Sequence, residues 1–170
     1  MGRLNKQINP LRRLRSRLSR IRHFRGHGVH SPYIYTIVRK VFMSRVLMSS
    51  ETLGLYDILE REARLRPRYR VELQNLATHC NYHSFVVDEC ELEGVELVVV
   101  TPRYPVEQIA NLMRSAVANG TTVVILHPEN RADRREVCDR VVVEHRSTTV
   151  RRADYLLIFN NHLPKQHFEL

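Results

Sequence analysis

Residues 95–126, VELVVVTPRYPVEQIANLMRSAVANGTTVVIL, contain the pattern that decides the fold. The stretch opens with an apolar run at 95–100 and closes with another at 123–126, and both are rich in β-branched residues. Short continuous runs of this kind are typical of strands covered on both faces. Between them, residues 106–119 place one apolar face on a helix that ends at Gly120, formed by Ile109, Leu112, Met113, Ala116 and Val117. The stretch therefore predicts a β-α-β unit with a right-handed crossover and two parallel strands.

Three further apolar runs extend this unit into a sheet. They lie at 85–87, 141–143 and 155–159, and each is short and rich in β-branched or aromatic residues. Together with the two strands above, they predict an α/β fold with a central sheet of about five strands.

The N-terminal half of the chain lacks this pattern and predicts helices instead. Asn9-Pro10 and Ser31-Pro32 each combine a capping side chain with a proline suited to the first helical position. Two more helices are expected at 51–66 and at about 69–82, with Pro67 ending the first of them. We therefore divide the chain into an arm at 1–26, N-terminal helices at 27–83 and a sheet region at 84–170, and we expect 27–170 to form one compact domain.

The positive charge of the chain is concentrated at its N-terminal end. The 170 residues carry 27 Lys or Arg against 18 Asp or Glu, a formal net charge of +9, and 43% of them are hydrophobic. Residues 1–50 contain twelve of the basic residues and no acidic one, so the rest of the chain carries 15 basic and 18 acidic residues. No apolar run approaches the length of about 18 residues that a membrane-spanning helix needs. The composition excludes bulk disorder and predicts a mildly acidic domain with a basic arm.

A basic amphipathic helix is predicted within the arm, between Pro10 and Gly26. Its narrow apolar seam consists of Leu11, Leu14, Leu18 and Ile21. The other faces hold Arg12, Arg13, Arg15, Arg17, Arg20 and Arg22, which are candidate contacts for nucleic-acid phosphates or anionic lipid. The alternative is that the seam docks on the body of the protein, on a partner protein or on a second copy of the chain, and leaves a solvated arginine face.

The cysteines do not suggest a disulfide framework. Cys80, Cys90 and Cys138 are odd in number and irregular in spacing, and the Arg-rich start lacks the apolar segment of a secretory signal. We therefore expect reduced thiols in a cytoplasmic protein, with the arm as an option for peripheral membrane contact. His79 and Cys80, with His83 and Cys90, form a possible metal cluster by residue type. Because Cys80 lies on the apolar side of its helix, we predict no metal site there.

A second group of candidate ligands lies just before the Ser31-Pro32 signal. His27 and His30 form an H-x-x-H arrangement that could bind a metal or orient a substrate, with Ser31 beside them as a hydrogen-bond donor. The structural alternative is that the glycines around His27 make a tight turn and Ser31 caps the next helix.

A third candidate segment follows the strand at 95–100. Arg103 and Tyr104 come after a parallel strand, at the end where open α/β sheets bind ligands, so they are candidate anion contacts. The alternative is a rigid loop flanked by Pro102 and Pro105. No P-loop, G-x-S-x-G or H-E-x-x-H motif is present.

Two segments resemble a known family. HGVHSPY at 27–33 and PKQHF at 164–168 resemble the two ends of a bacterial family of class I S-adenosylmethionine-dependent methyltransferases. Residues 71–89 look like the helix and first strand that lead into the cofactor loop of that family, with Asp88 or Glu89 at the acidic strand end. Residues 95–101 look like its fourth strand, and the rest follows its fifth strand and final antiparallel pair. The resemblance implies a partial Rossmann-like, methyltransferase-like sheet, with Asp88 as a candidate ligand residue.

The cofactor-binding part of that family has no counterpart here. Family members hold the methionine part of S-adenosylmethionine on a Gly-rich turn after the first strand, where backbone N–H groups approach the cofactor closely. A carboxylate after the second strand holds the ribose. In this chain the first strand leads into DECELEG at 88–94, with one glycine and four acids. The following helix and the second and third strands are missing.

The short connection also predicts a change of topology. In the complete family fold the first and fourth strands are parallel neighbours, and a parallel crossover needs roughly a dozen residues or more. Here only residues 90–94 separate the segments 85–89 and 95–101. We therefore predict an antiparallel hairpin that turns at Glu93-Gly94, with Asp88 near the opposite edge from the old cofactor crevice. The alternative is that residues 85–89 have left that place in the sheet.

These observations together predict a degenerate methyltransferase-like protein without a cofactor, acting as a non-catalytic binding or structural protein. Two other functions stay open. One is an active methyltransferase whose S-adenosylmethionine pocket is rebuilt from the N-terminal helices or from another chain. The other is an arginine-helix adaptor for anionic membrane or nucleic acid.

Overall fold

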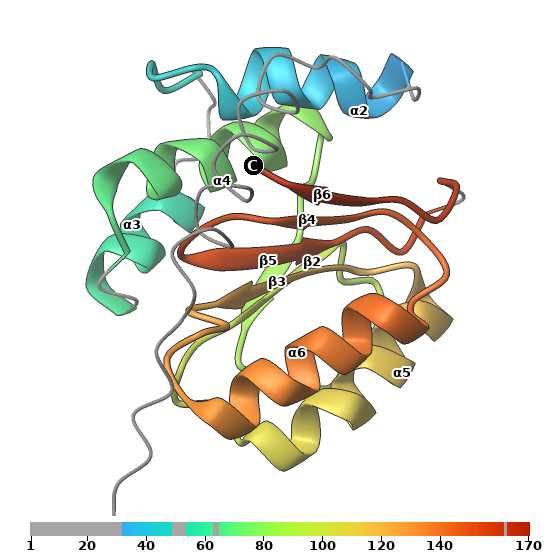
Figure 1. Cartoon of the computed structure of the whole chain (residues 1–170). Helices are drawn as coiled ribbons and strands as arrows, with labels where there is room; N and C mark the ends of the chain where they lie inside the picture. The colour runs from blue at the N-terminus through green and yellow to red at the C-terminus, as the bar shows by residue number, and fades with distance from the viewer. Residues whose placement is uncertain (1–31, 49–53, 63–64, 162) are drawn as a thin grey trace, which may run out of the picture.

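Six strands form one mixed sheet in the computed structural model, which describes residues 32–48, 54–62, 65–161 and 163–170 (Figure 1). The strand order is β1-β2-β3-β5-β4-β6. The first three strands are parallel, β5 runs antiparallel to both β3 and β4, and β6 is parallel to β4. The strands are β1 (Phe85–Val87), β2 (Leu97–Val100), β3 (Thr122–Leu126), β4 (Thr149–Arg151), β5 (Tyr155–Ile158) and β6 (His167–Glu169).

Several predicted features lie outside the described residues. These are the arm at 1–26 with its six candidate arginines, both histidines of the H-x-x-H motif, and Ser31.

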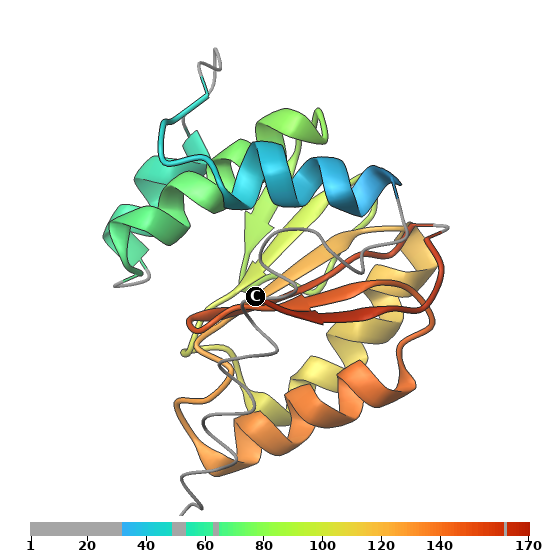
Figure 2. The ribbon, with the colours of Figure 1, turned by 45° about the horizontal axis from the view of Figure 1, so that its top comes forward.

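Helices cover both faces of the sheet (Figures 1 and 2). One face is covered by α5 (Ile109–Asn119), which follows the short 3-10 helix η2 (Val106–Gln108), and by α6 (Ala132–Glu144). The other face is covered by α2 (Pro32–Ile37) with its π-helical continuation η1 (Val38–Phe42), by α3 (Gly54–Glu62) and by α4 (Pro67–His79). Successive strand residues point to opposite faces, so the protein has two apolar cores. Within β2, Val98 and Val100 belong to the α5–α6 core, and Leu97 and Val99 to the other.

The predicted β-α-β unit is confirmed. β2 and β3 are parallel neighbours, with Leu97 opposite Thr122, and α5 connects them. Gly120 ends α5 in the left-handed conformation, with φ of +71°, and its N–H reaches the carbonyl oxygens of Ala116 and Val117. Glycine adopts this conformation without the strain that a Cβ atom would add.

The predicted strand at 141–143 is wrong, because these residues form the last part of α6. Cys138, Val141 and Val142 contact the α5–α6 core at helical spacing, whereas Val143 is 71% exposed. Packing at a period of 3.6 residues therefore outweighs the β-propensity of three adjacent valines. The sheet instead gains β4 and β6, and it has six strands rather than about five. These are three-residue strands, TVR and HFE, too short and polar to stand out in the sequence.

The predicted hairpin is also wrong, because β1 and β2 are parallel neighbours with Phe85 opposite Leu97. Both strands are shorter than the segments 85–89 and 95–101 assumed for them, so residues 88–96 rather than 90–94 connect them. At about 3.3 Å per residue, this segment extends about 30 Å, enough to return along a short strand without a helix. Asp88 turns the chain out of the sheet with φ of +57°, and Leu92 is buried in the α5–α6 core. Asp88 therefore lies at the same end of the sheet as Thr101, not near the opposite edge.

The helix boundaries differ from the predictions at the end of the first helix and at both ends of α4. The helix expected at 51–66 is described as α3 over Gly54–Glu62, and Leu65 and Arg66 are not helical. Pro67 is the first residue of α4, where its fixed φ fits and its missing N–H costs no hydrogen bond. α4 ends at His79 rather than at residue 82.

A buried ion pair connects α4 to the turn between β4 and β5. Glu72 is fully buried and accepts hydrogen bonds from Arg152, Nη2 at 2.6 Å and Nε at 3.1 Å, and from the Tyr155 hydroxyl at 2.9 Å. Arg152 is 4% exposed, and its guanidinium carbon lies 5.6 Å from the ring centre of Phe42 and 5.5 Å from that of Tyr69. These contacts hold the helical layer against the sheet.

Candidate functional site

The carboxyl ends of β1, β2 and β3 form the edge where open α/β sheets bind ligands. Asp88 follows β1 and points at the end of β2, where its carboxylate accepts the Thr101 N–H at 2.7 Å and the Thr101 hydroxyl at 2.5 Å. The Asp88 N–H also donates to the carbonyl oxygen of Val99 at 3.0 Å. Both carboxylate oxygens of this candidate ligand residue are therefore bonded to the neighbouring strand end.

Arg134 of α6 also reaches this edge, and no pattern in the sequence singles it out. Its side chain is among the largest that are fully buried, although it sits in a charged segment typical of a solvated face. Its Nη2 donates to the carbonyl oxygens of Val100 at 3.2 Å, Thr101 at 3.0 Å and Leu126 at 3.1 Å. Burial lowers the pKa of the guanidinium, an effect that Cys138 and then Asp88 oppose. The ends of β2 and β3 are thus covered by the protein's own side chain.

Arg103 and Tyr104 do not converge on one ligand position. Arg103 is exposed, whereas Tyr104 is buried in the α5–α6 core, and burial raises the pKa of its phenol. The Tyr104 N–H donates to the carbonyl oxygen of Thr101 at 3.2 Å, and the Arg103 N–H donates to the Thr101 hydroxyl at 3.2 Å. This geometry corresponds to the rigid, proline-flanked turn that the sequence left as the alternative.

The segment 88–96 packs against the protein rather than forming a backbone cradle. Ser115 of α5 donates its hydroxyl to the Cys90 carbonyl at 3.3 Å, and Ser84 donates to the Gly94 carbonyl at 2.9 Å. The Glu96 carboxylate accepts the N–H groups of His83 and Ser84 at 2.5 and 3.0 Å. These backbone hydrogen bonds, that of His83 first, lower the pKa of Glu96.

A shallow hollow of about 410 Å³ lies beside β1. Ile58 and Arg61 of α3 form one wall, and the three residues of β1 with Glu89 form the other. Among the strands that the structure describes, β1 has one neighbour, β2, so its outer edge faces this hollow. An arginine and a glutamate are the charged groups in its lining.

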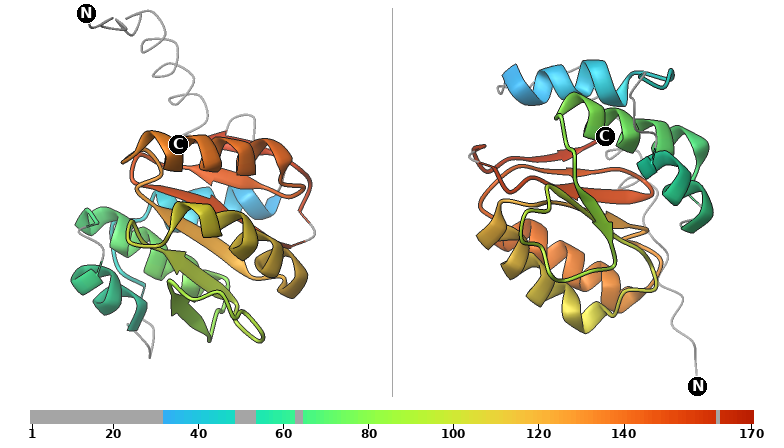
Figure 3. Two further views of the ribbon diagram at one scale, coloured as in Figure 1. Left: turned by 90° about the horizontal axis from the view of Figure 1, so that it is seen from below. Right: turned by 180° about the vertical axis from the view of Figure 1, so that it is seen from behind.

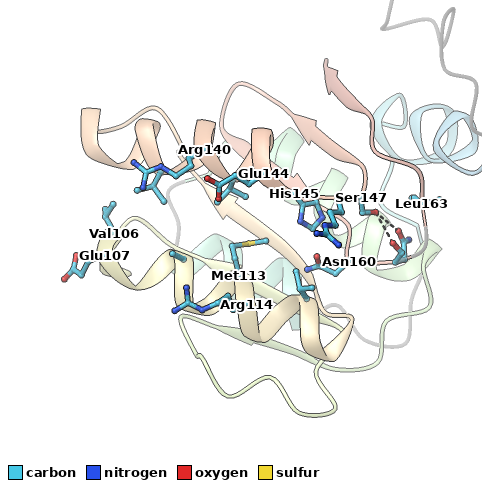
Figure 4. Close-up of a pocket in the computed structure, with 16 residues that line it drawn as sticks. Val106, Glu107, Met113, Arg114, Arg140, Glu144, His145, Ser147, Asn160 and Leu163 are labelled. Atoms are coloured by element: carbon cyan, nitrogen blue, oxygen red, sulfur yellow. Dashed lines mark hydrogen bonds between the residues drawn. The ribbon is translucent and has the colours of Figure 1, made fainter.

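A larger groove of about 900 Å³ runs between α5 and α6, which lie side by side on one face of the sheet (Figures 3 and 4). Its floor is apolar and consists of Ala110, Met113 and Val117 from α5 with Val137 and Val141 from α6. Val117 is 57% exposed, so the prediction that it points inward is wrong. The helical periodicity places Val117 on the same face as Met113, but α6 does not close over it.

The groove has a charged rim and a polar mouth. Figure 4 shows Glu107 and Arg140 near one end, and His145, Ser147, Asn160 and Leu163 near the other. Two hydrogen bonds connect residues at the mouth: His145 Nε2 lies 2.8 Å from the Phe159 carbonyl oxygen, and the Ser147 hydroxyl donates to the Asn161 carbonyl at 3.0 Å. Nothing in the sequence pattern indicated this groove, because it depends on how far apart two helices pack.

The described residues contain no group of three or more His, Cys, Asp or Glu side chains that could hold a metal ion. Of the cysteines considered as ligands, Cys80 is half-buried and its Sγ lies 3.4 Å from the Tyr33 hydroxyl. Burial raises the pKa of the Cys80 thiol.

The fold and these sites define an α/β protein with a mixed six-stranded sheet between two helical layers. No known protein family, curated protein or solved structure matches the chain. Within the described ranges, no helix is both long and apolar enough to cross a membrane.

Proposed function

We propose that this chain is a shortened, degenerate methyltransferase-like protein that has lost the usual S-adenosylmethionine site and acts as a non-catalytic binding or structural protein. The observation that carries the proposal is the closed edge of the sheet. Asp88 is bonded to Thr101, and Arg134 is bonded to three carbonyl oxygens at the ends of β2 and β3. The polar side chains at the carboxyl ends of these strands therefore bond to the protein's own strand ends.

The topology supports the relationship on which this proposal rests. The family resemblance implies a first, a fourth and a fifth strand side by side, followed by an antiparallel pair. β1, β2 and β3 are parallel neighbours in that order. β5 follows antiparallel to β3, and β4 follows antiparallel to β5. The parallel pairing of β1 with β2 agrees with the complete family fold more closely than the predicted hairpin did.

The residues present do not fit S-adenosylmethionine at its usual position. A glycine-rich turn lets backbone N–H groups approach the cofactor, whereas residues 88–93 contain no glycine. In that segment Leu92 is buried in the α5–α6 core, and each oxygen of the Asp88 carboxylate already accepts one hydrogen bond from Thr101. Binding would therefore cost the protein part of its own packing.

Calorimetric titration of the full chain with S-adenosylmethionine tests the proposal. We expect no saturable heat, and we expect the thermal unfolding midpoint to stay unchanged by the cofactor. Circular dichroism of the same sample shows that the protein is folded. Saturable binding in the range of about 1 to 10 μM would overturn the proposal.

A second candidate is an active methyltransferase with a rebuilt pocket, and the hollow between α3 and β1 favours it. Arg61 could pair with the carboxylate of the methionine part, and Glu89 with its ammonium group or with ribose hydroxyls. If titration detects binding, Arg61→Ala and Glu89→Gln should each weaken it about tenfold or more if they hold these groups. Arg135→Ala, which removes an exposed arginine on α6, is the matched control.

A further inference from the structure

We propose that the groove between α5 and α6 is the docking site of residues 9–25 of the same chain, so that the arm folds back on its own domain. The proposal does not depend on whether a cofactor binds. It rests on the apolar floor of the groove, on the place where the described chain begins, and on a match of lengths.

The groove has the form that an amphipathic helix requires. Helix-in-groove recognition places an apolar stripe into a trough between helices. The floor of the trough here consists of apolar side chains from both helices, small or branched ones together with Met113. Its Val117 is 57% exposed, a large exposure for a residue whose α5 neighbours Leu112 and Ala116 are fully buried. The apolar seam predicted for the arm, from Leu11 to Ile21, has the matching chemistry.

The described chain begins close to the mouth of the groove. Its first helix, α2, starts at Pro32, and the ring of Tyr33 packs edge-on against Phe159 with 6.3 Å between the ring centres. Phe159 leads directly into Asn160, which lines the mouth of the groove. Residues 26–31 can extend about 20 Å, which matches the thickness of a sheet with a layer packed about 10 Å away on each face.

The length of the seam matches the length of the groove. The α5 side of the groove runs from Val106 to Val117, about 17 Å at the helical rise of 1.5 Å per residue. The seam from Leu11 to Ile21 spans about 15 Å if it is helical. An arm that enters at the mouth therefore fills the groove and runs parallel to α5 and α6.

The charges of the rim permit this arrangement but do not drive it. Glu107 at one end and Glu144 toward the other can pair with arginines that flank the seam. The rim also carries three arginines: Arg114 is hydrogen-bonded to Asn111, Arg140 Nη2 lies 3.2 Å from Glu136, and Arg146 lies between His145 and Ser147 of the mouth. Because the rim carries arginines as well as glutamates, burial of the seam supplies the attraction, and the outer arginine face stays in solvent.

Covalent attachment favours the chain's own arm over a second copy. A short flexible linker gives an attached segment an effective concentration in the millimolar range. A free copy of the chain at micromolar concentration would compete poorly for the same groove.

Cysteine cross-linking of the full chain tests the contact. In a background of Cys80→Ser and Cys90→Ser, which leaves the buried Cys138, we combine Leu18→Cys on the seam with Val117→Cys in the groove. Ser16→Cys with Val117→Cys is the matched control, because residue 16 lies opposite the seam on a helical wheel. We expect an intramolecular disulfide to form about tenfold faster in the seam pair than in the control. Equal rates, or a product that is mainly a covalent dimer, would overturn the proposal.

Hydrogen exchange gives an independent measurement that needs no engineered cysteine. We expect the amides of residues 9–25 to be protected in the full chain, and Val117→Asp to remove that protection by placing a charge on the groove floor. Val143→Asp is the matched control, because Val143 is a valine of α6 that is 71% exposed and does not line the groove. If residues 9–25 exchange at the same rate in all three proteins, the arm does not occupy the groove.

Discussion

Replacing Glu72 by glutamine should destabilise the protein more than any comparable change at a surface ion pair. The substitution keeps the size of the side chain but removes the charge that Arg152 faces at 2.6 and 3.1 Å. The amide of glutamine would also point N–H donors at groups that are themselves donors. One of these is the Tyr155 hydroxyl, which donates to the Glu72 carboxylate in the native protein. Arg152 cannot turn to water, because it is 4% exposed and lies between the rings of Phe42 and Tyr69.

The size of the effect follows from this burial. Removing one partner of a buried ion pair costs about 3 to 5 kcal/mol, because the other charge is left buried without compensation. The Arg70–Glu60 pair has a similar distance, 2.8 Å, but the Glu60 side chain is 58% exposed. Glu60→Gln should therefore cost less than about 1 kcal/mol.

Urea unfolding followed by far-ultraviolet circular dichroism measures both variants, and the absence of tryptophan from the chain rules out tryptophan fluorescence as a probe. With a urea dependence of about 2 kcal/mol per M, the midpoint of Glu72→Gln should fall by about 1.5 to 2.5 M, and that of Glu60→Gln by less than about 0.5 M. The triple change Glu72→Met, Arg152→Met and Tyr155→Phe should be more stable than Glu72→Gln, because it leaves no buried polar group unpaired. A Glu72→Gln midpoint within the range of the Glu60→Gln control would refute this reasoning.

Four further predictions follow from other parts of the structure. Burial, and secondarily Arg151, lowers the pKa of His167 in the folded protein. As the pH falls, this imidazole is therefore protonated in the unfolded chain at a higher pH than in the folded protein. The free energy of unfolding should therefore decrease from about pH 7.5 to pH 5.5, and less so in His167→Asn, as urea titrations at each pH would measure. Thiol labelling of the native protein should modify the exposed Cys90 first and Cys138 last, because burial raises the pKa of Cys138 to about 11, and mass spectrometry reads the order. Asp88→Ala should cost about 1 to 3 kcal/mol in urea unfolding, through two lost hydrogen bonds and a positive φ. Gly120→Ala should cost about 1 to 2 kcal/mol in thermal unfolding, since its φ is +71° and alanine is strained there.

The edge of the sheet shows why candidate residues were only partly predictable. Asp88 was found through a family resemblance, and it does lie at the carboxyl end of β1. Arg134, which bonds the Thr101 carbonyl at the same strand end, comes from α6, more than forty residues later, in a segment whose charge suggested a solvated face. The burial of an arginine depends on which carbonyl oxygens a distant strand presents to it, and that information is not local.

The β1–β2 connection shows a different limit. Counting residues between the segments 85–89 and 95–101 gave too short a connection, because the chain leaves the sheet at Asp88 and the next strand begins at Leu97 rather than at residue 95. A strand ends where its hydrogen-bonding partner ends, so its length is a property of the pair and not of one segment.

By itself, the sequence determined the β-α-β unit at 95–126, the helical N-terminal half of the domain and the glycine that ends α5, because periodicity and left-handed backbone preferences act over a few neighbouring residues. Only the tertiary structure decided the parallel return of β1, the helical state of residues 141–143, and the burial of Glu72 and Arg134. It also decided that Val117 lines an open groove. Each of these depends on contacts between segments far apart in the chain, where desolvation and packing outweigh local propensity.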